Sequence, residues 1–215
     1  MLRSKYSRFG YLALLILAIV IPLITKNPYV THLFVLTFIY AIFALGYDIL
    51  IGTMGQFSFG HQALWGMGAY VSGLLALDLG VPVPLSMLAG IAGTALFGLF
   101  IGWVALRLRS AYLAIITMGF AMILQVIVIN WIPVTHGWEQ VRGIPFASFG
   151  NIIILRTPLS YYYLVTALLI LVIFILIRMQ NSRLGRGLCA LRENEERAVS
   201  LGIPVFKYFL LDSFR

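Results

Sequence analysis

The side chains most able to do chemistry lie in one glycine-rich stretch between residues 48 and 70. They are Asp48, Gln56, Ser58, His61 and Tyr70, with Gly60 between the serine and the histidine. A helix that faces lipid has no need of such hydrogen-bonding groups, and irregular backbone at membrane depth is tolerated only where protein or a water-filled cavity satisfies it. We therefore predict a broken or re-entrant helix here, with these residues as candidates for a translocation pathway or gate.

Other interpretations of this stretch stay open. It could be a tight cytoplasmic turn in which His61 caps or packs, or the next helix could hold a carboxylate through its free N–H groups. Asp48 could bond backbone donors, carry a proton or reach the headgroups, because the cost of a charge depends on its depth in the bilayer. A broken helix with Asp48 would also suit an ion-coupled secondary transporter.

The spacing of Ser58 and His61 raises the possibility of a membrane enzyme in which His61 acts with Ser58 or Asp48. A nucleophile and its base must lie within hydrogen-bond reach, but Gly60 disfavours the regular helix that would bring the two together. The sequence has no Gly-x-Ser-x-Gly elbow, no cluster of metal ligands and no phosphate-binding Gly-x-x-x-x-Gly-Lys-Ser/Thr loop. We therefore predict a chain that is not an enzyme, needs no metal or cofactor and does not itself bind ATP.

A second polar stretch, near the C-terminus, has the spacing of a short helix. Glu195, Ala198 and Gly202 recur at i, i+3 and i+7, which places them on one face of a helix that ends near Gly202 and Pro204. Two pairs of opposite charge at i,i+4 spacing support this helix: Arg192 with Glu196, and Glu193 with Arg197.

The elements that must position these residues are predicted to be transmembrane helices. Of the 215 residues, 61% are hydrophobic and 10% are charged, against roughly 25% charged in globular domains. Windows of about 20 apolar residues, long enough to span a bilayer, occur about six times. They are Phe9 to Thr25, His32 to Ile51, Phe57 to Leu77, Val83 to Leu106, Tyr112 to Ile132 and Tyr161 to Ile177. The predicted fold class is an all-α, polytopic transmembrane helix bundle.

The basic residues predict the orientation of this bundle, because short cytoplasmic loops hold the excess of Lys and Arg. With both termini inside, only Lys26, Arg142 and Arg156 of the fifteen basic residues lie outside. The net charge of +8 therefore reflects membrane topology, and no nucleic-acid partner is predicted. The single cysteine, Cys189, falls in the cytoplasm.

Glycine and proline mark further features. Small residues four apart, Ala69 with Gly73, Ala89 with Gly93 and Gly98 with Gly102, predict close helix contacts. The outer segment from Pro133 to Ser160 is rich in both residues, so we expect turns and a short interfacial helix there.

Three ordered motifs resemble the permease subunits of branched-chain amino acid ABC importers, specifically their M-type subunit. The first is Gly55-Gln-x-Ser-x-Gly-His61 followed by Gly66-x-Gly-Ala-Tyr70, and the second is Leu106-Arg-Leu-Arg109-x-x-Tyr112. The third runs from Gly185-Arg186 through Arg192-Glu193-x-Glu195-x-x-Ala198 to Gly202-Ile203. The same inner-membrane permease family is shared with urea and ribose-type importers.

This resemblance implies a multi-pass subunit of the bacterial cytoplasmic (inner) membrane, embedded in lipid, that passes Leu, Ile or Val across it. Its implied partners are cytoplasmic ATP-binding subunits, a second homologous permease subunit and an extracytoplasmic substrate-binding protein. Glu195, Ala198 and Gly202 would couple the chain to the ATPase. A related permease for urea or amides is the alternative substrate assignment.

Some features depart from the family pattern. Asn194 and Arg197 stand where an acidic residue and alanine are common, and Asp48 stands where asparagine is common. We predict a permease core in residues 1–178, a cytoplasmic coupling loop and helix in 179–208, and the truncated start of a further helix in 209–215. The expected chain is thus a shortened family member.

Overall fold

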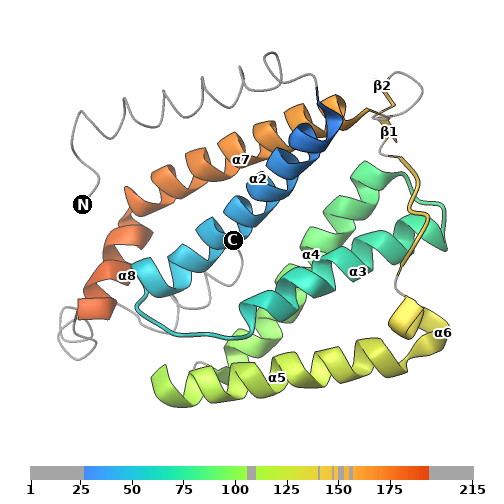
Figure 1. Cartoon of the computed structure of the whole chain (residues 1–215). Helices are drawn as coiled ribbons and strands as arrows, with labels where there is room; N and C mark the ends of the chain where they lie inside the picture. Colours follow the sequence, from blue (N-terminus) through green and yellow to red (C-terminus); the bar gives the residue numbers. More distant parts are fainter. Residues whose placement is uncertain are drawn as a thin grey trace. The chain divides into compact units, whose positions relative to one another are not determined.

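A computed structural model describes residues 27–105, 110–139, 141–146, 148–149, 153–154 and 157–193 of the chain (Figure 1). The elements in order are α2 (Pro28–Asp48), the π-helix η1 (Ile49–Thr53), α3 (His61–Leu77), α4 (Val83–Ala105), α5 (Ser110–Asn130), α6 (Ile132–Thr135), the 3-10 helix η2 (Gly137–Glu139), the strands β1 (Ser148–Phe149) and β2 (Ile153–Ile154), α7 (Pro158–Gln180) and α8 (Arg183–Glu193). The strands are only two residues each, so the predicted all-α fold class is confirmed.

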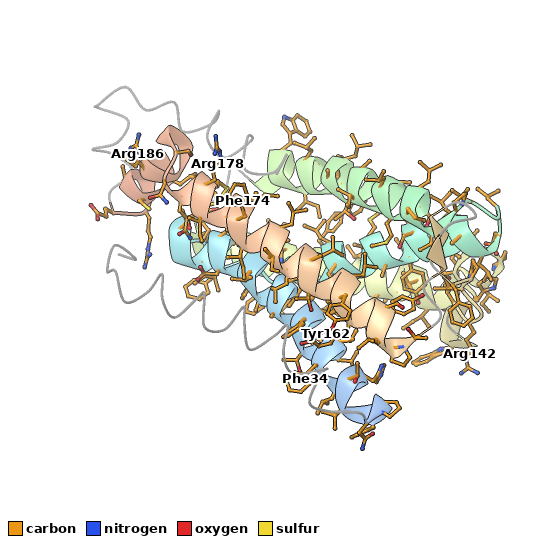
Figure 2. The ribbon with its side chains drawn as sticks, turned by 90° about the horizontal axis from the view of Figure 1, so that it is seen from above. Phe34, Arg142, Tyr162, Phe174, Arg178 and Arg186 are labelled. Atoms are coloured by element: carbon orange, nitrogen blue, oxygen red, sulfur yellow. The ribbon has the colours of Figure 1, made fainter. Side chains whose placement is uncertain are left out.

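The described residues divide into two compact units. Residues 27–45 and 157–179 form unit 1, and the remainder forms unit 2. Unit 1 pairs most of α2 with α7 around Val35, Tyr162 and Val165, which are all buried. The Tyr162 ring lies 5.5 Å from that of Phe38, centroid to centroid, and Figure 2 labels Tyr162 on α7 and Phe34 on α2 at this contact. Burial of aromatic rings therefore holds these two helices together.

Unit 2 is built on a hairpin of α3 and α4, with α5 packed against both. The turn between them uses Gly80 at φ +62°, a conformation that a side chain disfavours. The two helices come closest at glycines: a Cβ on Gly90 would lie 2.8 Å from the Gly68 carbonyl oxygen. The predicted small-residue contacts hold for Gly93, beside Val71, and for Gly98, beside Leu64.

On α3, the residue that contacts α4 is Gly68, one position before the predicted Ala69. Ala69 is exposed, whereas its neighbour Gly68 faces α4. A Cβ on Gly68 would lie 2.7 Å from the Thr94 hydroxyl oxygen, so the contact needs a residue without a Cβ. Gly73 is buried, but it faces Val141 and Ile144 instead of α4.

Four helical segments among the described residues are long and apolar enough to cross a membrane. They are Pro28–Thr53, Val83–Trp103, Tyr112–Asn130 and Pro158–Gln180, and they coincide with four of the predicted windows. The third window is helical only from His61 onward, and its 17 residues reach about 26 Å at 1.5 Å per residue. The first window lies outside the described residues. The count of about six spans and the orientation stay predictions.

The segment between α5 and α7 contains the expected turns and a short helix. α6 ends at Thr135, and its C-cap His136 has a φ of +59°. The helix η2 follows directly. The His136 imidazole Nε2 lies 3.7 Å from the Asp78 carboxylate just after α3, an ion pair when the histidine is protonated. β1 and β2 pair antiparallel, with Ser148 opposite Ile154. Whether α6 lies at the membrane interface stays a prediction.

Candidate functional site

The helix formed by α2 and η1 ends in a widened turn. The Met54 and Gln56 N–H groups donate to the carbonyls of Ile49 and Leu50, at 3.1 and 3.0 Å, so these bonds span five and six residues instead of four. Gly55 follows at φ +70°, the left-handed conformation in which glycine commonly ends a helix. The predicted interruption between α2 and α3 is therefore present, and it starts with a π-turn.

Residues 55–60, which we call the break segment, have no regular secondary structure. α5 holds the far end of this segment through Thr117, a side chain only 3% exposed. The Phe59 N–H donates to the Thr117 hydroxyl oxygen at 3.1 Å, and that hydroxyl donates in turn to the Leu113 carbonyl at 2.8 Å. A Cβ on Gly60 would lie 3.2 Å from the Thr117 Cβ, so glycine allows the close approach.

His61 starts α3 and reaches back to the end of α2. Its ring stacks on that of Tyr47, with centroids 5.6 Å apart and an interplanar angle of 30°. A Cβ on Gly46 would lie 3.3 Å from two imidazole atoms. The histidine thus packs against the last turn of α2. This packing joins the helices on the two sides of the break.

The other predicted pathway residues have different surroundings. Asp48 is exposed and makes no side-chain capping bond to η1. The Ser58 hydroxyl accepts the Gly60 N–H at 3.3 Å, and the side chain of Gln56 is partly exposed. Gln56, Ser58, Gly60 and His61 thus lie within or directly after the break segment, and Asp48 lies at the end of α2.

Tyr70 lies apart from this group. It is nine residues beyond His61 on the same helix, about 13 Å along the axis at 1.5 Å per residue, and its side chain is partly exposed. The predicted set is therefore one cluster at the break and one residue farther along α3.

Three residues at the break are not among the site candidates predicted from the sequence. Thr117 is a lone hydroxyl in the middle of an apolar helix, and Tyr47 directly precedes Asp48; neither has a spacing that predicts its partner. Arg192, on α8, donates to the Gly52 carbonyl at the end of η1. All three contacts join segments that are distant in the sequence or separated by the break.

The predicted coupling residues Glu195, Ala198 and Gly202 lie outside the described residues. The described chain stops with α8, directly before them. Among the side chains that the structure describes, no three of His, Cys, Asp or Glu come together as a metal site would require. The described geometry of the break offers hydrogen bonds and an irregular backbone.

Comparison with known families identifies the family of this chain. Residues 29–212 match the family described as "Branched-chain amino acid transport system / permease component". The chain belongs to this family. The match includes both sides of the break, α8 and the predicted coupling residues, and it confirms the resemblance seen in the sequence. Membership, together with the four apolar helices, makes the chain a multi-pass membrane protein.

Individual relatives agree with the family match. The chain is 31% identical to the high-affinity branched-chain amino acid transport system permease protein LivM of Escherichia coli K12, in an alignment that covers 89% of the chain and 50% of LivM. It is 28% identical to LivH of Salmonella typhimurium and to BraD of Pseudomonas aeruginosa, each alignment covering 76% of the chain and 58% of the relative. The chain thus spans about half the length of LivM. No solved structure matches it.

Proposed function

We propose that this chain is a permease subunit of an ATP-driven importer that moves branched-chain amino acids across the bacterial inner membrane. The family match over residues 29–212 carries the proposal, and the names of LivM, LivH and BraD as branched-chain amino acid permeases support it. The chain would work with cytoplasmic ATP-binding subunits, a second permease subunit and an extracytoplasmic binding protein, and would hydrolyse no ATP itself.

The break is the best candidate for the gate of the pathway. Its backbone is irregular, and its polar groups are held by Thr117 and by short-range bonds. Irregular backbone in a membrane protein is stable only beside protein or water, and broken helices commonly form transporter sites. We assign Asp48, Gln56, Ser58, Gly60 and His61 to this gate region. Tyr70 would line the pathway farther along α3.

Uptake in cells tests the transport role. The chain is expressed in its operon context, and entry of labelled leucine is measured with excess unlabelled leucine, valine or urea as competitor. Competition by leucine and valine but not by urea is expected. Uptake of labelled urea but not of labelled leucine would replace the substrate with an amide, and proton-driven uptake without the ATP-binding subunits would overturn the importer assignment.

Capture of the ATP-binding subunit tests the coupling role of Glu195, Ala198 and Gly202. Gly202→Trp should reduce capture strongly, because an indole on the predicted docking face prevents close approach. Gly202→Ala is the matched control and should retain most of it. Equal capture by the wild type and Gly202→Trp would count against this docking face.

A further inference from the structure

Arg192 connects the cytoplasmic helix α8 to the break. Its guanidinium donates from Nη1 to the carbonyl oxygen of Gly52, which lies 140 residues earlier in the chain. The stem of the same side chain lies over Gly55: a Cβ there would be 2.7 Å from the arginine Cγ and 3.3 Å from its Cδ. Figure 1 shows α8 next to the end of the α2–η1 helix. Both contacts lie within unit 2.

Arg192 donates to the Gly52 carbonyl, which lies next to the carbonyls that are bonded in the widened turn. The N–H groups of Met54, Gly55 and Gln56 donate to the carbonyls of residues 49, 51 and 50. The Gly52 carbonyl is the next one toward the helix end, where carbonyls have no intrahelical donor. A cation is favoured at this end because the helix dipole is negative there, and a guanidinium can satisfy the carbonyl directly.

A second arginine on α8 shows that this contact is specific to its position. Arg186 donates to the Asn181 carbonyl at 2.8 Å, a local bond to a residue five positions earlier. Both arginine side chains are exposed, and Figure 2 labels Arg186 on α8. Of these two, only Arg192 reaches the membrane segment, from a position three residues before the predicted coupling residue Glu195.

We propose that Arg192 is a clamp that makes α8 and the break segment move together. It holds the Gly52 carbonyl near the end of the α2–η1 helix and covers Gly55, the residue at which the break segment starts. Displacement of α8 by a bound cytoplasmic partner then changes the conformation of the break segment through this side chain. Arg192 is thus a positioning residue, and its role in transport rests on the proposed permease function.

Thiol labelling of the break segment tests the clamp without transport. The whole chain carries Gln56→Cys in a Cys189→Ser background, is purified in lipid nanodiscs, and its rate of reaction with a maleimide is measured. Arg192→Ala should raise this rate by about threefold to tenfold, as expected for loss of a charge-assisted hydrogen bond at an exposed site. Arg192→Lys, which keeps a cationic donor, should raise it less. Arg186→Ala is the matched control and should leave the rate unchanged.

A rate in Arg192→Ala no higher than in Arg186→Ala would overturn the clamp. The Arg192→Lys comparison decides the same question if the alanine variant does not fold. With the partner subunits present, Arg192→Ala should lower leucine uptake relative to ATP hydrolysed, and an unchanged ratio would overturn the transmission role. Absence of leucine uptake by the wild type, with the labelling difference intact, would overturn the proposed function and leave the clamp supported.

Discussion

At the scale of single residues, the break is held by side chains on neighbouring helices. The His61 ring packs on Tyr47 across the break. The Thr117 hydroxyl, on α5 and 58 residues later in the sequence, accepts the Phe59 N–H of the break segment. The first contact packs a residue before the break against one after it, and the second satisfies a backbone N–H of the break segment. These partners therefore define the conformation of the gate region that we propose.

Replacing Tyr47 tests the contact across the break. Tyr47→Leu removes the stacked ring and should lower the free energy of unfolding by about 0.5–1.5 kcal/mol, as for other aromatic pairs. Tyr29→Leu is the control, because Tyr29 is on the same helix and 72% exposed. Thermal unfolding in nanodiscs gives the comparison. Equal losses in the two variants would show that the stacking on His61 contributes nothing.

Replacing Thr117 tests the anchor on α5. Thr117→Val keeps the shape of the side chain but leaves the Phe59 N–H without its acceptor, which should cost about 1 kcal/mol. Leucine uptake should also fall, because the break segment loses its bond to α5 at Phe59. Thr117→Ser retains the hydroxyl and should preserve both properties. A valine variant as stable and active as the serine variant would contradict the anchoring role.

At the scale of elements, the α3–α4 hairpin depends on backbone contact between two glycines. Glycine is an expensive residue inside a helix, by about 1 kcal/mol relative to alanine, so a helical glycine needs a packing reason. Gly90 has one, because its missing Cβ makes room for the Gly68 carbonyl. Gly119 on α5 has no such neighbour within 4 Å. The same residue type thus has different roles on adjacent helices.

Alanine substitutions at these two glycines should have opposite effects. Gly90→Ala places a methyl group 2.8 Å from a backbone oxygen, and the helices must separate, at a cost of about 1–3 kcal/mol. Gly119→Ala should stabilise the chain by up to about 1 kcal/mol through helix propensity. Unfolding midpoints in nanodiscs measure both. Stabilisation by Gly90→Ala would contradict the close approach of α3 and α4.

At the scale of the whole molecule, the basic residues predict the orientation in the membrane. The distribution of Lys and Arg predicts that α8 faces the cytoplasm and that the segment after α5 faces outward. Cys189 and Arg142 suit a test because they lie in these two regions and are both exposed. Figure 2 labels Arg142 near the segment after α6.

Labelling of intact cells with a membrane-impermeant maleimide checks the orientation. The native Cys189 should react only after the cells are permeabilised. Arg142→Cys in a Cys189→Ser background should react in intact cells. Reaction of Cys189 from outside, together with protection of the cysteine at position 142, would invert the topology.

Much of the architecture follows from local pattern. Apolar runs of about 20 residues predict spanning helices because a bilayer requires every backbone group to be bonded within its segment. Glycines and polar groups after residue 51 predict the interruption, and the structure has it. The predicted third window nevertheless began too early, because Gly55 and the bonds of the break segment delay the start of α3 to His61.

The sequence by itself determined the helical class, most of the helical segments, the position of the break and the family. These depend on composition and on residues close together in the chain. Only the tertiary structure decided that Tyr47, Thr117 and Arg192 hold the break, and that Gly68, not Ala69, faces α4. Such contacts join residues from separate helices, and their partners depend on helix rotation and approach, which periodicity in an almost uniformly apolar sequence leaves undetermined.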